Sequence, residues 1–104
     1  MATSAEWHEK YEDMSELALN FSRAVKSVQE ELEAVDWYNQ RAQATKDEQL
    51  RRILEHNRDE EIEHAIMGLE YLRRINPMFD KHMRTYLFTT GDITDIEEEA
   101  EKQG

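Results

Sequence analysis

Residues 50–71 read LRRILEHNRDEEIEHAIMGLEY, and the spacing of one set of side chains in this stretch decides the fold. The members of the set recur three or four residues apart, as on one face of an α-helix: Leu50, Leu54, Asn57, Glu61, His64, Gly68 and Tyr71. Asn76-Pro77 stops the pattern, because proline cannot continue a helix. Thr45-Lys46-Asp47-Glu48 predicts a capping box, in which Thr45 and Glu48 cover the first free amides. A long helix is therefore expected between the box and Pro77.

A second long helix is predicted upstream, to about Gln43. Its apolar side chains alternate four and three residues apart: Trp7, Tyr11, Met14, Ala18, Phe21, Val25, Val28, Leu32 and Val35. Two long helices joined by a few residues fold back antiparallel. A short helix is expected over about Met78–Phe88, and Gly91 should end it. Thr94 is expected to cap a last acidic segment that frays into the tail.

The chain is thus predicted to be all-α and to form one domain over residues 1–104. This domain is an antiparallel two-helix hairpin plus a short C-terminal helix, with about 92–104 as an acidic, flexible tail. One hairpin cannot enclose a core, and the second helix carries a further apolar side: Ile62, Ala65, Ile66, Leu69 and Leu72. Self-association is therefore expected, with a two-fold dimer completing a four-helix bundle.

Composition narrows the classes of function. The 104 residues are 36% charged, with a formal net charge of -11, so nucleic acid is excluded and cations or basic partners are favoured. There is no cysteine, which excludes disulfides and thiolate metal sites. No long apolar run or signal-like segment is present, so we expect no membrane partner and a cytoplasmic location.

Three candidate metal ligands stand out. Glu31 takes an apolar place in a stripe on the first helix: Leu17, Phe21, Ala24, Val28, Glu31, Val35, Tyr38 and Ala42. Glu61 and His64 occupy the inward stripe of the second helix, three residues apart, where both can reach one metal. Counted from the turn, Glu31 and Glu61 both lie roughly 21–24 Å away. The hairpin therefore brings the three to one level.

These ligands amount to half of a di-iron site. Such bundles use a Glu from each of two helices and a Glu-x-x-His from each of the other two. A second copy would supply the missing half, and two divalent ions would balance the four carboxylates, with iron or manganese as the suited metals. A Glu-x-x-His also arises by chance in many helices. An inward Glu can also snorkel to water or pair with Arg.

Three blocks of sequence closely resemble the encapsulated ferritins: residues 30–38, EELEAVDWY; residues 56–65, HNRDEEIEHA; and residues 84–88, RTYLF. The resemblance implies a two-helix ferritin-like protein that assembles as a ring of dimers, a homodecamer, inside an encapsulin nanocompartment. It also implies that the encapsulin shell protein is a partner. One departure is that residues 97–104, EEEAEKQG, show no apolar docking peptide of the kind that encapsulin cargo carries.

The resemblance also implies residue roles. Glu31, Glu61 and His64 correspond to the ligands of a di-iron centre shared by two chains. Trp37 and Tyr38 match an aromatic pair beside that centre, although core packing is the more common role of such residues. Glu30 and Glu33 match acidic residues that attract incoming metal, with a solvated helix face as the alternative.

The leading hypothesis is a ferroxidase that oxidises Fe(II) to Fe(III) with O2 for iron storage in an encapsulin shell. One alternative is a di-iron or di-manganese peroxidase like the rubrerythrins, although the chain lacks the cysteines of their electron-transfer domain. Another is a non-catalytic helical assembly module whose acidic surface binds a basic partner.

Overall fold

The computed structural model describes residues 7–104, and every regular element in that range is helical. The order is a 3-10 turn η1 (Tyr11–Asp13), then α1 (Glu16–Ala44), α2 (Glu48–Ile75), α3 (Pro77–Tyr86) and α4 (Ile93–Gln103). The all-α prediction is confirmed. The chain divides into two compact units, one ending at Leu72 and the other running from Arg73 to Gly104.

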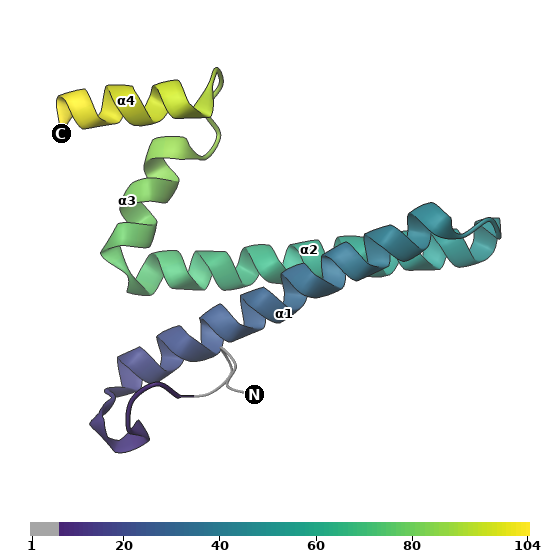
Figure 1. Ribbon diagram of the computed structural model, residues 1–104, viewed down its shortest axis with the longest axis horizontal. Helices are drawn as coiled ribbons and strands as arrows, with labels where there is room; N and C mark the ends of the chain where they lie inside the picture. Colours follow the sequence, from purple (N-terminus) through teal and green to yellow (C-terminus); the bar gives the residue numbers. More distant parts are fainter. Residues whose placement is uncertain (1–6) are drawn as a thin grey trace. The chain divides into compact units, whose positions relative to one another are not determined.

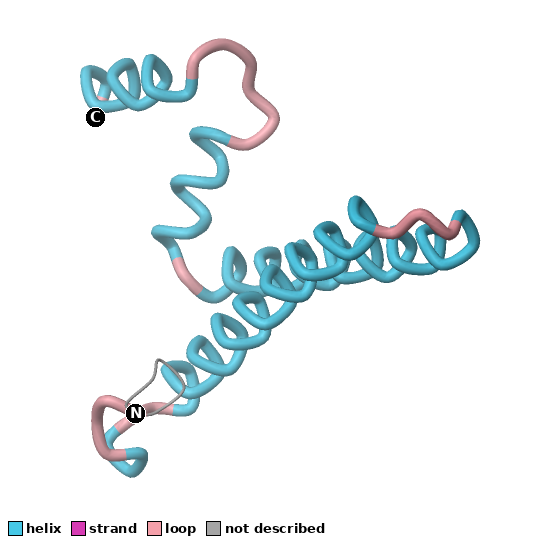
Figure 2. Tube along the Cα trace, turned by 45° about the vertical axis from the view of Figure 1, so that its right-hand side comes forward, coloured by secondary structure: helices cyan, strands magenta, loops and turns pink. Residues whose placement is uncertain are grey.

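The first unit is a helical hairpin. Figure 1 and Figure 2 both show α1 and α2 running side by side from a short connection, as the two-helix prediction requires. The Arg58 guanidinium on α2 donates to the Asn39 side-chain oxygen on α1 at 3.0 Å, which ties the helices together across the hairpin. The side chains buried in this unit come from both helices: Leu19, Val28, Ala42, Ala65 and Leu72.

Helix α1 begins later than its apolar spacing suggests. The expected start at Trp7 is wrong, because Ser15 caps the helix by accepting a hydrogen bond from the Ala18 amide at 3.1 Å. Trp7 and Tyr11 lie before this cap and meet edge to face, with ring centroids 5.7 Å apart. The Ser15 cap therefore sets the N-terminus of α1, whereas hydrophobic spacing alone would begin the helix earlier in the chain.

The predicted capping box at the turn is also wrong. The Thr45 hydroxyl donates to the Arg41 carbonyl at 2.6 Å, so it serves the end of α1 instead. Asp47 covers the start of α2, where its carboxylate accepts from the Leu50 amide at 2.8 Å. The Glu48 carboxylate turns outward to Arg52 at 3.3 Å. Thr45 and Asp47 could both accept from the free amides at the start of α2. Asp47, directly before the helix, is the one that does so.

The second apolar side of α2 is divided by the structure. Ala65 and Leu72, expected to face a partner, are only 2% exposed in the single chain. Ile62 and Ile66 of the same set stay exposed, at 42% and 58%. Other large apolar side chains of the hairpin are also exposed: Leu17, Leu32, Trp37, Leu50, Ile53, Met67 and Tyr71. Self-association stays a prediction, and these side chains are the surface available to it.

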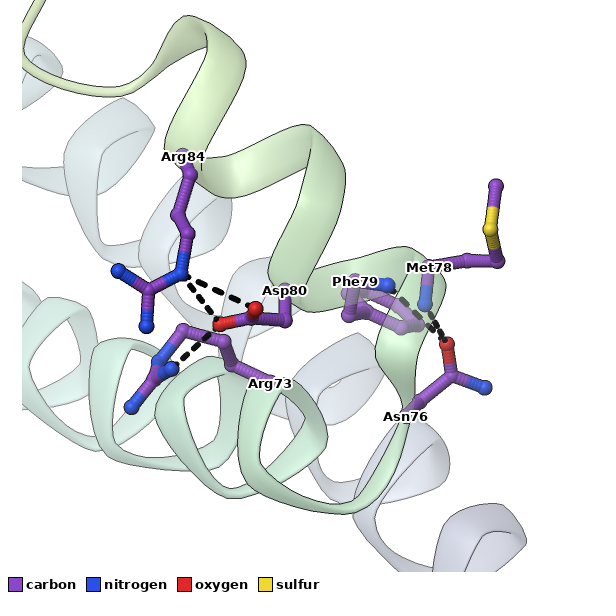
Figure 3. Close-up of polar contacts among 6 residues, drawn as sticks. All are labelled: Arg73, Asn76, Met78, Phe79, Asp80 and Arg84. Atoms are coloured by element: carbon purple, nitrogen blue, oxygen red, sulfur yellow. Dashed lines mark hydrogen bonds and ion pairs between the residues drawn. The ribbon is translucent and has the colours of Figure 1, made fainter.

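The second unit joins the end of α2 to α3 and α4. Asn76 caps α3 by accepting from the Met78 and Phe79 amides at 2.9 and 3.0 Å, with Pro77 at the first helical position (Figure 3). The third helix predicted over 78–88 is present but ends at Tyr86. Arg73 and Arg84 both donate to the Asp80 carboxylate, which ties the first turns of α3 to the end of α2 (Figure 3).

The acidic segment after Gly91 is helical. Sequence predicts a flexible tail over about 92–104, whereas the structure has α4 over most of it. The cap is Asp92 and not Thr94, because the Asp92 carboxylate accepts from the Thr94 and Asp95 amides at 2.8 and 3.2 Å. Within residues 7–104, no helix is both long and apolar enough to cross a membrane.

Candidate metal centre

Glu31 lies near the middle of α1, where the inward stripe places it against α2. Its Oε2 atom is buried and has no hydrogen-bond partner, and it is the one such side-chain atom among residues 7–104. Burying an unpaired polar atom costs about 1–3 kcal/mol, and more for a charged group. Native proteins seldom keep such an atom unless something else satisfies it. A cation is the ligand that suits a carboxylate left in this way.

Glu61 and His64 form the second half of the arrangement. They lie three residues apart on α2, and Glu61 Oε2 is 4.0 Å from His64 Nδ1. That separation is too long for a hydrogen bond but leaves both atoms able to contact one cation. Their side chains are 27% and 43% exposed, so neither is sealed inside the single chain.

Gly68 marks where Glu31 meets the second helix. A Cβ atom built on Gly68 would lie 3.9 Å from Glu31 Oε2, and Gly68 stands one helical turn beyond His64. Glu31 therefore faces α2 beside Gly68, and its pairing with Glu61 and His64 stays a prediction. Within residues 7–104 no three His, Asp or Glu side chains are close enough together to hold a metal ion.

Glu60 is a carboxylate that lies outside the predicted inward stripe of α2. It lies between two imidazoles on α2, with Oε1 3.6 Å from His56 Nε2 and Oε2 3.9 Å from His64 Nε2. The repeat of four residues from His56 through Glu60 to His64 is the sequence signal that could have shown this row. His56 itself is exposed. The row gives His64 a second acidic neighbour, on its Nε2 side.

The other predicted site residues lie on α1. Glu30 and Glu33 are exposed, Trp37 is 51% exposed, and Tyr38 is half-buried. The Arg41 guanidinium lies over the Tyr38 ring, 5.6 Å from its centroid. No hydrogen bond in the described part of the chain joins Trp37 or Tyr38 to the candidate ligands. Their predicted roles, like those of Glu30 and Glu33, stay predictions.

Comparison with known proteins gives consistent matches. The family model described as EncFtn-like matches residues 6–90. A ferritin-like protein of Thermotoga maritima is 55% identical over 94 residues, which are 90% of this chain and 82% of that protein. An encapsulated ferritin-like protein of Rhodospirillum rubrum is 58% identical over 90 residues, 86% of this chain and 64% of that protein.

A solved structure is also similar. The crystal structure of protein ne0167 from Nitrosomonas europaea superposes with a TM-score of 0.80 at 52% identity. The match covers 84% of this chain and 96% of that one. The fold described above is therefore shared with an experimentally determined relative.

Proposed function

This chain belongs to the EncFtn-like family of encapsulated ferritins, and from that premise we propose that it is a ferroxidase. It would oxidise Fe(II) to Fe(III) with O2 at a di-iron centre shared by two chains. The observation that carries the proposal is the buried, unpartnered Oε2 of Glu31 facing the helix that bears Glu61 and His64.

The donor set fits iron. Carboxylate oxygens and an imidazole nitrogen suit iron or manganese, and Glu31, Glu61 and His64 are the residues that would hold the metal. Each Fe(II) held there would be oxidised to Fe(III) by giving up one electron, with O2 as the electron acceptor. Two chains would contribute four carboxylates, and two divalent ions would balance their charge.

Assembly and location follow from the same proposal. The exposed apolar side chains on both helices of the hairpin support a dimer as the building block, and a decameric ring is proposed by analogy with the family. The encapsulin shell protein is the proposed partner, with the ring inside a cytoplasmic nanocompartment where the iron is stored. Glu30 and Glu33 would attract incoming metal, and Trp37 and Tyr38 would lie beside the centre.

The test is Fe(II)-dependent consumption of O2. Glu31→Ala should abolish the fast initial phase, because it removes a ligand from both halves of the centre. Asp36→Ala is the matched control, since Asp36 is an exposed carboxylate on the same helix that accepts a hydrogen bond from Gln40. It should retain the wild-type rate. An unchanged initial rate of O2 consumption in Glu31→Ala would contradict the assignment of Glu31 as a metal ligand.

The same preparation separates the alternatives. Faster turnover with hydrogen peroxide than with O2 would favour the di-iron or di-manganese peroxidase. A purified oligomer without stoichiometric iron by elemental analysis would favour the non-catalytic assembly module.

A further inference from the structure

Gly68 occupies a crowded place on the ligand-bearing face of α2. It follows Glu61 by seven residues and His64 by four, so the three share one side of the helix. A Cβ atom at Gly68 would lie 2.6 Å from Val28 Cγ2, closer than real side chains approach. The same atom would lie 3.9 Å from Glu31 Oε2. The close approach of the two helices is therefore located next to the candidate ligands.

Val28 cannot easily move out of the way. It is 6% exposed, and its branched Cβ leaves essentially one side-chain rotamer in a helix. An added methyl group at position 68 must therefore displace the backbone of one helix. Val28 and Glu31 are three residues apart on the same face of α1, so a shift of α1 at Val28 carries Glu31 with it.

Local conformation gives no reason for a glycine at this position. Gly68 lies inside α2 with ordinary helical backbone, where alanine is the more stable residue. Glycine therefore stands here although its helix propensity is lower than that of alanine. The contact with Val28 is the reason that the described neighbours supply.

We propose that Gly68 is a positioning residue for the metal centre. Its missing side chain lets Val28 pack directly on the α2 backbone, and this spacing sets the position of the Glu31 carboxylate against α2, beside Gly68 and one helical turn from His64. The proposal rests on the proposed function, because the role it assigns is to place a metal ligand.

The experiment compares four full-length proteins: wild type, Gly68→Ala, Val28→Ala and the double variant. Metal binding is followed by absorption during titration with Co(II), which needs no oxidation step. Gly68→Ala should weaken Co(II) binding by about 10–100-fold, the usual effect of disturbing the support of a ligand. The double variant should bind as Val28→Ala does, because the clashing methyl group has been removed.

Thermal unfolding of the metal-free proteins gives a second readout, because the effect of Gly68→Ala on the Tm should change sign between the two backgrounds. Gly68→Ala should lower the Tm in the wild-type background, where it meets Val28. The same change should raise the Tm in the Val28→Ala background, where only the higher helix propensity of alanine remains. Gly104→Ala is the matched control, because it makes the same substitution in the other compact unit and should leave Co(II) affinity unchanged.

Each result decides one question. If wild type binds no Co(II), both the proposed function and the role of Gly68 toward metal are overturned. If wild type binds and Gly68→Ala binds equally well, only the positioning role is overturned. Weakened binding that Val28→Ala does not restore would also overturn it, because the clash would not be the cause. If Gly68→Ala fails to fold, the double variant decides: it must fold and bind as Val28→Ala does.

Discussion

Glu31 in the hairpin and Asp80 in α3 are both partly buried carboxylates, yet their surroundings differ in kind. Asp80 accepts two hydrogen bonds of 3.0 Å from Arg84 Nε and another from Arg73 (Figure 3). These bonds, Arg84 first, hold the pKa of Asp80 below its ordinary value of 3.8. The buried Oε2 of Glu31 has no such partner. The Asp80 carboxylate is supplied with cations by its own chain, whereas the Oε2 of Glu31 has no partner and is the atom to which the proposed function assigns a metal ion.

The largest expected effect comes from exchanging each carboxylate for its amide. Glu31→Gln should weaken Co(II) binding by about 100-fold, because a charged ligand is lost. Asp80→Asn should leave binding unchanged, but should lower the Tm of the metal-free protein because the two Arg partners lose their counter-charge. Glu31→Gln should not lower that Tm, since it replaces an unpaired buried charge with a neutral group.

Co(II) titration and thermal unfolding of both variants, each with and without metal, check that one variant loses metal binding and the other loses stability. If both variants lose metal binding to the same extent, or both lose stability, the distinction between the two carboxylates is mistaken.

The next effect is a pH dependence of stability from Asp80. Its pKa is lower in the folded protein than in the unfolded chain, so its stabilising contribution is fully present above about pH 3.8 and is lost as the pH falls through the folded value. Asp92 acts in the same direction, because hydrogen bonds from Thr94 and Asp95 lower its pKa as well. The Tm difference between wild type and Asp80→Asn should shrink below pH 3.8.

Metal-free protein is used for this measurement, so that ligand protonation at the centre does not enter. A Tm difference that stays constant as the solution is acidified would show that the Asp80 charge has no part in holding α3.

The smallest effect belongs to a carboxylate that is partnered but lies in water. Glu48 and Arg52 are 3.3 Å apart on α2, with side chains 69% and 71% exposed. Glu48→Gln should change the free energy of unfolding by only about 0.3–0.5 kcal/mol, as for other exposed pairs one helical turn apart. Urea unfolding with and without added salt measures it. A larger loss than that of Asp80→Asn would contradict the order proposed for these carboxylates.

Much of the fold was predictable because its signals are local. The three- and four-residue spacing of apolar side chains predicted α1 and α2, and Asn76-Pro77 predicted the end of α2. Helix starts were predicted less well. Ser15, Asp47 and Asp92 are the caps, whereas spacing and the Thr-x-x-Glu pattern pointed to other residues. Several short polar side chains near each start can accept from the same amides, and the sequence does not rank them.

The candidate site divides in the same way. Glu61 and His64 could be paired from sequence because three residues along a helix bring two side chains to one face. The inward position of Glu31 could be predicted from its stripe. That its Oε2 atom would be buried without a hydrogen-bond partner could not. Burial of that atom depends on how closely the opposite helix approaches, which no residue of α1 controls alone.

Periodicity was thus sufficient to predict two long helices, and the short connection between them predicted that they are antiparallel. The same periodicity selected the three candidate ligands, whose role stays a prediction. The spacing of the helices was not predictable in this way. Val28 and Gly68 are forty residues apart in sequence. Their fit becomes visible only in the folded hairpin, where the branched side chain of Val28 occupies the space that a side chain on Gly68 would need. Ala65 and Leu72 turned inward for the same reason: burial is a property of the packed pair of helices.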